Sequence, residues 1–220
     1  INYDHIEIIE NSITDDYNFA ASIKFCALER MPLEDTLIDG DCFFQKGKIY
    51  GIIEGARTDF LCTTFEGKNA VLDNLELCKF AHSIDFEEPF KVPEIESLNG
   101  WYNTSVMRFN NQDLKNIYID AYKKNLKICE SVKWNNRLWP DIIIEQFHLT
   151  QLLNDYTVQT ITPNISAESD SFAKKIGFTH LGMSKYKEQE RLENYLRTYY
   201  AEAYRMLEKH TTRLIQHCYK

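Results

Sequence analysis

Two aspartates near residue 40 carry the strongest indication of chemistry in this chain. The segment 36–41 reads TLIDGD, so Asp39 and Asp41 stand two positions apart directly after a predicted buried strand. Side chains alternate between the faces of a regular strand, but Gly40 can break that alternation and let both carboxylates reach one ion. Hard oxygen ligands of this kind suit Mg²⁺ or Mn²⁺, which also take phosphate oxygens. An ordinary acidic turn after a strand is the alternative, since Asp and Gly are common turn formers.

A histidine far along the chain is the candidate third ligand. His180 lies in the short extended segment 178–182, and Gly182 and Lys185 follow it. Glycine lets a ligand approach closely, and the lysine could neutralise a diphosphate. A hydrogen-bonded core histidine and a solvated lysine are the alternatives. We expect Asp39, Asp41 and His180 to bind Mn²⁺ or Mg²⁺.

The elements that must position these residues alternate between strands and helices. Strands are predicted at 5–10, 36–38, 60–65, 101–109, 156–161 and 178–182, and helices at 19–30, 112–131, 140–153, 166–176 and 187–217. This alternation favours an α/β sheet flanked by helices over a helical bundle or a β-sandwich. We expect one domain over residues 1–185, with a C-terminal amphipathic helix in 186–220 packed on it.

Several short motifs stand in a characteristic order along the chain. They are SIKF at 22–25, LIDGDCF at 37–43, WYNTSV at 101–106, EQ at 145–146 and HLGMSK at 180–185. In this order the chain resembles the GT-A-type glycosyltransferases over about residues 22–185, with the retaining, glycogenin-like families nearest. The resemblance implies a GT-A-like mixed sheet, a hexosyltransferase-like activity, a nucleotide-diphosphate sugar as donor, an acceptor that the motifs do not specify, and a metal ion held by the D-x-D motif and the histidine. It implies substrate contacts from Lys24, Asn103, Thr104, Ser105, Gly182 and Lys185.

Glu145 and Gln146 take the catalytic positions that the resemblance implies, near the reacting carbon or the acceptor hydroxyl. An inverting transferase needs a carboxylate base, for which Glu145 is the candidate. In a retaining transferase the amide of Gln146 would lie beside the sugar instead. The polar face of a surface helix is the alternative interpretation of both residues.

The chain departs from the family pattern in three places. Ser105 stands where the N-T-G-V motif has glycine, and the spacing from His180 to Gly182 is one residue shorter than in the glycogenin-like pattern. At most one strand precedes the helix at 19–30, so we expect part of the N-terminal nucleotide-binding half to be missing, through truncation or because a partner supplies it.

Two other functions compete with sugar transfer. The serine and the short N-terminal part favour a non-catalytic binding protein that keeps a glycosyltransferase-like scaffold. The other is a haloacid-dehalogenase-like phosphotransferase with Asp39 as nucleophile. Phe43 stands where that family has threonine or valine, which counts against it.

The composition limits the classes of binding partner and indicates a cellular compartment. With 25 Lys and Arg against 33 Asp and Glu, the net charge of −8 and the pI near 5.3 disfavour binding to a nucleic-acid backbone. No apolar run approaches the length of a membrane span, and the mean hydropathy of −0.43 agrees. Six cysteines without a C-x-x-C pair predict reduced core thiols in a cytoplasmic protein. The aromatic stripe Tyr195, Tyr199, Tyr200 and Tyr204 predicts packing on the sheet or a homodimer seam.

Overall fold

The computed structural model describes residues 21–40, 42–44, 48–136, 138–163 and 175–180, together with 197, 198, 201, 202 and 205. The chain divides into two compact units between residues 180 and 181, where the sequence suggested a division after 185. In the second unit, the few described residues are helical and exposed. The predicted strand at 5–10, the tyrosine stripe and most of the predicted helices at 166–176 and 187–217 lie outside the described residues.

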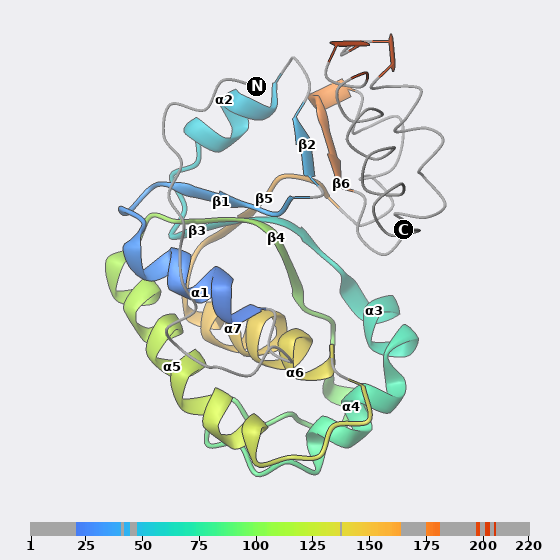
Figure 1. The fold of residues 1–220 in the computed structure, drawn as a ribbon. Coiled ribbons are helices and arrows are strands. Elements are labelled where there is room, and N and C mark those ends of the chain that lie inside the picture. The colour runs from blue at the N-terminus through green and yellow to red at the C-terminus, as the bar shows by residue number, and fades with distance from the viewer. Residues whose placement is uncertain are drawn as a thin grey trace, which may run out of the picture. The chain divides into compact units, whose positions relative to one another are not determined.

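A four-stranded sheet forms the centre of the first unit, with the order β1-β4-β3-β5. Its strands are β1 Thr36–Ile38, β4 Tyr102–Phe109, β3 Phe60–Phe65 and β5 Val158–Thr160. β4 is antiparallel to both β1 and β3, and β5 is parallel to β3. The strands β1, β3 and β5 therefore run in one direction, and their carboxyl ends meet the start of β4 at one edge of the sheet (Figure 1).

Helices pack on both faces of this sheet. One face is covered by α1 Ala21–Arg30, by α5 Gln112–Glu130, and by the continuous run of α6 Trp139–Asp141, η2 Ile142–Phe147 and α7 His148–Leu152 (Figure 1). The main core on this side includes Phe25, Phe60, Met107 and Tyr118. The other face packs against α2 Ile49–Glu54. The predicted α/β class with a mixed sheet and flanking helices is confirmed.

A separate two-stranded sheet connects the two sequence regions that were expected to share a metal ion. Its strands are β2 Cys42–Phe44 and β6 Phe178–His180, paired antiparallel with Cys42 opposite His180. The Cys42 N–H donates to the Asp39 carbonyl at 3.0 Å, so the chain turns at Gly40 between β1 and β2. Phe44 and Phe178 of this pair join Ile49 and Leu61 in a second, smaller core.

The remaining elements lie between β3 and β4 and before β5. They are α3 Gly67–Asp73, α4 Leu75–His82, η1 Ile95–Ser97 and η3 Leu153–Asp155. The helices α2, α3 and α4 were not predicted, because none exceeds eight residues and so none shows a long apolar period. Cys62, Cys78 and Cys129 are buried thiols, as expected. Among the described residues, no helix is long and apolar enough to span a lipid bilayer.

Candidate functional site

Lys24, Asp39 and Glu145, three of the residues selected from the sequence, form an ion-paired cluster. The Lys24 Nζ lies 2.9 Å from Asp39 Oδ1 and 2.5 Å from Glu145 Oε1. The side chain of Glu145 is 9% exposed, that of Lys24 15% and that of Asp39 32%. They come from η2, α1 and the end of β1, so the tertiary structure brings three distant segments together. The cluster opens to solvent on the side of Asp39.

The charge of Lys24 depends on its two carboxylate neighbours. Burial alone would lower its pKa, but the negative charges of Glu145 and Asp39, with their hydrogen bonds, raise the pKa of Lys24 above its ordinary value. Lys24 is therefore a permanent ammonium between two acidic side chains. Such a residue can neutralise carboxylates or bind an anionic group, but it cannot act as a base at neutral pH.

Glu145 is oriented by a π-helical segment. Its helix, η2, runs from Ile142 to Phe147, and such segments are rare and occur frequently at functional sites. The wider helical turn is stabilised by Tyr118, whose hydroxyl donates to the Glu145 carbonyl at 2.8 Å. The Thr104 hydroxyl also donates to Glu145 Oε1. Glu145 thus has a buried, doubly bound Oε1, while neither Lys24 nor Thr104 binds its Oε2.

An irregularity in β4 directs Thr104 toward Glu145. The partner of residue 62 in β3 is Met107, and the partner of residue 64 is Asn103, so residues 104–106 lie opposite the single residue Thr63. A bulge of this kind interrupts the regular alternation of side chains and re-aims them. Thr104 faces the helices that carry Lys24 and Glu145, as its bond to Glu145 shows. Thr104 of the N-T-S-V segment therefore belongs to the same cluster as Lys24 and Glu145.

Ser105, which stands where the family pattern has glycine, is built into this bulge. Its hydroxyl lies 2.6 Å from the Thr63 hydroxyl, and the same Thr63 oxygen accepts from Val106 N–H at 2.8 Å. The Ser105 carbonyl accepts from Asp39 N–H at 2.8 Å. The serine is 3% exposed and has two roles: it fills the bulge and it holds the backbone of Asp39.

Glu66 is a site residue that the sequence analysis missed. Its Oε1 accepts from Asn103 Nδ2 at 2.7 Å, and its Oε2 accepts from Trp101 Nε1 at 2.9 Å. Asn103 in turn accepts from Ser105 N–H at 3.0 Å, so Glu66 supports the bulge from the end of β3. The signal for Glu66 was the same as for Asp39, a carboxylate directly after a buried strand. It was obscured by the turn-forming residues that follow.

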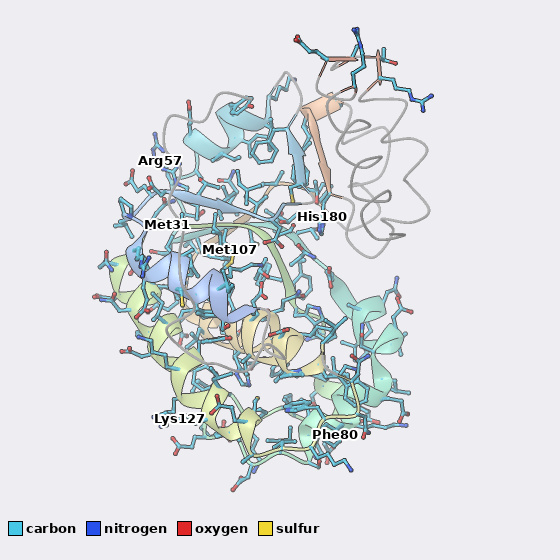
Figure 2. The ribbon with its side chains drawn as sticks, viewed as in Figure 1. Met31, Arg57, Phe80, Met107, Lys127 and His180 are labelled. Atoms are coloured by element: carbon cyan, nitrogen blue, oxygen red, sulfur yellow. The ribbon has the colours of Figure 1, made fainter. Side chains whose placement is uncertain are left out.

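The pairing of β2 with β6 brings the backbone of His180 near the segment that follows Asp39, and a role for His180 as a metal ligand stays a prediction. The pairing of β2 with β6 places His180 opposite Cys42, the residue that follows the D-G-D segment. Figure 2 shows His180 at the end of β6 that is nearer the four-stranded sheet. Residues directly opposite in an antiparallel pair have neighbouring side chains on one face. His180 therefore lies opposite a residue whose backbone binds that of Asp39, despite their separation in sequence.

The donor set of two carboxylates and an imidazole has the chemistry that Mn²⁺ accepts. Asp41, Gly182 and Lys185 lie outside the described residues. Within the described part of the chain, no three His, Cys, Asp or Glu side chains are grouped as a metal site. A Cβ placed on Gly40 would meet no described atom within 4 Å. Asp39 and His180 are therefore residue types that Mn²⁺ accepts, and metal binding here stays a prediction.

Gln146 follows Glu145 in the π-helical segment and is half-buried. Its backbone carbonyl accepts from the Thr150 hydroxyl at 2.8 Å. The contacts to Lys24 and Thr104 are made by Glu145. Of the two predicted catalytic residues, the described cluster therefore contains the carboxylate.

Comparison of the chain with protein-family models, with curated proteins and with solved structures finds no significant match. Its function must therefore be inferred from the chemistry and geometry of its own residues.

Proposed function

We propose that this protein is a metal-dependent glycosyltransferase that moves a sugar from a nucleotide-diphosphate donor to an acceptor. The observation that supports the proposal most is the convergence of Lys24, Asp39, Thr104 and Glu145 at the edge where β1, β3 and β5 end. Ligands of open α/β sheets bind outside the carboxyl ends of the strands. The pairing of His180 beside the D-G-D turn adds a fifth predicted residue to the same edge.

The chemistry follows from the charges of these residues. Cleavage of a glycosyl–diphosphate bond develops negative charge on the leaving diphosphate, which needs a cationic environment. A divalent ion held by Asp39, Asp41 and His180 would supply electrostatic stabilisation of that charge. Lys24 is the described basic residue that we assign to the diphosphate, and the roles of Lys185 and Gly182 stay predictions from the resemblance. Asn103 binds Glu66 and Ser105 binds Thr63, and these contacts hold the start of β4 in place at this edge.

Glu145 is the residue we assign to the acceptor hydroxyl in an inverting transfer. Lys24 and Thr104 both bind its Oε1, which restricts the carboxylate to one orientation and leaves Oε2 to receive a proton. In a retaining transfer the amide of Gln146 would lie beside the sugar. The acidic net charge and the buried thiols support a cytoplasmic protein that does not bind nucleic acid. A homodimer through the C-terminal helix remains a prediction.

Calorimetric titration with uridine diphosphate, with and without Mn²⁺, tests the proposal. We expect nucleotide binding that requires the metal and weakens by at least about tenfold in Asp39→Asn and Asp41→Ala, because each removes a charged ligand. Asp59→Asn is the matched control, since Asp59 precedes β3 at the opposite edge of the sheet and binds Thr157 and Asn111 instead. Turnover is measured as release of the nucleotide diphosphate from a mixture of nucleotide sugars.

Three outcomes would contradict sugar transfer in different ways. Nucleotide binding that does not depend on Mn²⁺ and is unchanged in Asp41→Ala would contradict the proposed metal site. Metal-dependent binding without transfer or hydrolysis would favour the non-catalytic binding protein. A phosphoryl-enzyme formed on Asp39 would favour the phosphotransferase.

A further inference from the structure

The ammonium of Lys24 occupies a position that is lined by oxygen atoms. Its Nζ lies 2.9 and 3.2 Å from Asp39 Oδ1 and Oδ2, 2.5 Å from Glu145 Oε1 and 3.4 Å from the Thr104 carbonyl. An ammonium has three N–H bonds, and these acceptors belong to three groups. The donor capacity of Lys24 is therefore matched by two carboxylates and one backbone carbonyl.

Such a set of oxygens is also the set that hard divalent cations take. A second lysine shows that an oxygen-lined ammonium alone is not unusual in this chain. Lys68 Nζ donates to the carbonyls of Ile95, Glu96 and Leu98 at 3.1, 3.2 and 2.8 Å. These acceptors are neutral, whereas Lys24 faces two negative charges, a buried one on Glu145 and a partly exposed one on Asp39. The surroundings of Lys24 thus attract a cation more strongly than those of Lys68.

We propose that Lys24 is a built-in counter-ion that competes with the divalent ion for Asp39. This inference rests on the proposed function, since it concerns the same metal site. Two cations on one carboxylate repel each other, and the repulsion is strong where solvent screens little. An anionic diphosphate that draws the Lys24 ammonium away from Asp39 would remove this competing positive charge. The metal ion and the diphosphate then bind cooperatively, with Lys24 as the coupling residue.

The affinity for Mn²⁺, measured from the electron paramagnetic resonance signal of the free ion, tests this inference in the full chain. We expect Lys24→Met to bind Mn²⁺ about tenfold or more tightly than the wild type, because the competing charge is gone. Lys68→Met is the matched control and should leave the affinity unchanged. Asp39→Asn should weaken binding in the wild type and should abolish the gain from Lys24→Met.

A double variant separates direct competition from a simple change of net charge. Lys24→Met alone removes the ammonium that Glu145 and Asp39 share, which is costly for folding. Lys24→Met combined with Glu145→Gln removes one positive and one negative charge, so the net charge of the three side chains is unchanged. We expect this double variant to fold and still to bind Mn²⁺ more tightly than the wild type, because Lys24 no longer competes for Asp39.

Uridine diphosphate provides a second measurement. After correction for its own complex with Mn²⁺, it should tighten Mn²⁺ binding to the wild type and not to Lys24→Met. Equal tightening in both proteins would overturn the coupling role of Lys24. If Asp39→Asn weakens Mn²⁺ binding while neither Lys24 variant changes it, the competition is wrong and the proposed metal site stands. If Asp39→Asn has no effect, the metal site and the inference are both wrong.

Discussion

Cys42 lies directly opposite His180 in the antiparallel pair of β2 and β6. The turn at Gly40 joins Cys42 to Asp39, and the Cys42 thiol also lies 3.7 Å from the Ser105 carbonyl that binds the backbone of Asp39. This small sheet therefore ties the histidine segment, the D-G-D segment and the bulge of β4 to one edge of the central sheet. The pairing of Cys42 with His180 and the hydrogen bond from Cys42 N–H to the Asp39 carbonyl are backbone contacts, whereas the contact with the Ser105 carbonyl is made by the Cys42 side chain.

Gly100→Ala should lower the free energy of unfolding by about 1–3 kcal/mol. Gly100 has a φ of +124°, and an added Cβ would lie 2.5 Å from the Gly67 carbonyl oxygen and 2.6 Å from its carbon. The close approach of these two glycines joins the end of β3 to the start of β4, where Glu66 binds Trp101. Urea denaturation measures the effect.

Gly40→Ala is the control for this substitution. An added Cβ there would meet no described atom within 4 Å, so we expect a change below about 1 kcal/mol. Equal losses of stability at both positions would show that the contact between Gly67 and Gly100 does not set the cost.

Ser105→Ala should cost about 1–2 kcal/mol, because it removes a buried hydrogen bond to the Thr63 hydroxyl. Ser105→Gly should cost roughly 0.5–1 kcal/mol more, since glycine also makes the unfolded chain more flexible. Thus the protein with glycine at position 105, as in the family pattern, should be less stable than the protein with the native serine. Thr64→Val is the comparison. The Thr64 hydroxyl is buried and has no hydrogen-bond partner among the described residues, so its removal should be neutral or stabilising.

Asp59 should make the free energy of unfolding depend on pH in the acidic range. Hydrogen bonds from Asn111 and Thr157 lower the pKa of Asp59 below its usual value of 3.8. A carboxyl with a lowered native pKa stabilises the fold above the unfolded pKa, and that stabilisation disappears as the pH falls through the native pKa. Asp59→Ala should therefore cost about 0.5–1 kcal/mol at pH 7, at the low end for such bonds because Asp59 lies near solvent.

Urea denaturation at pH 7 and at successively lower pH measures this contribution. The difference between wild type and Asp59→Ala should shrink as the pH falls below 3.8. A difference that stays constant with pH would mean that the carboxylate does not act through its charge.

Local patterns accounted for much of the fold. β1 and β3 have their predicted bounds, β4 begins one residue later than predicted, and α5 begins after Asn111, whose side chain accepts from Leu114 N–H as a helix cap. These elements were predictable because apolar periodicity and capping are properties of neighbouring residues. The π-helical turn at Glu145 was not, since it depends on the contacts of Tyr118 and Thr104 with that residue.

The sequence alone determined the class of the sheet and the kinds of residue available for chemistry, because both follow from composition and short-range pattern. Only the tertiary structure decided that Lys24 binds Asp39 and Glu145 together, that Glu66 supports Asn103, and that Ser105 fills a bulge. These contacts join segments far apart in the chain. Their geometry is set by strand register and helix packing, which depend on the whole core and cannot be inferred from any local stretch of sequence.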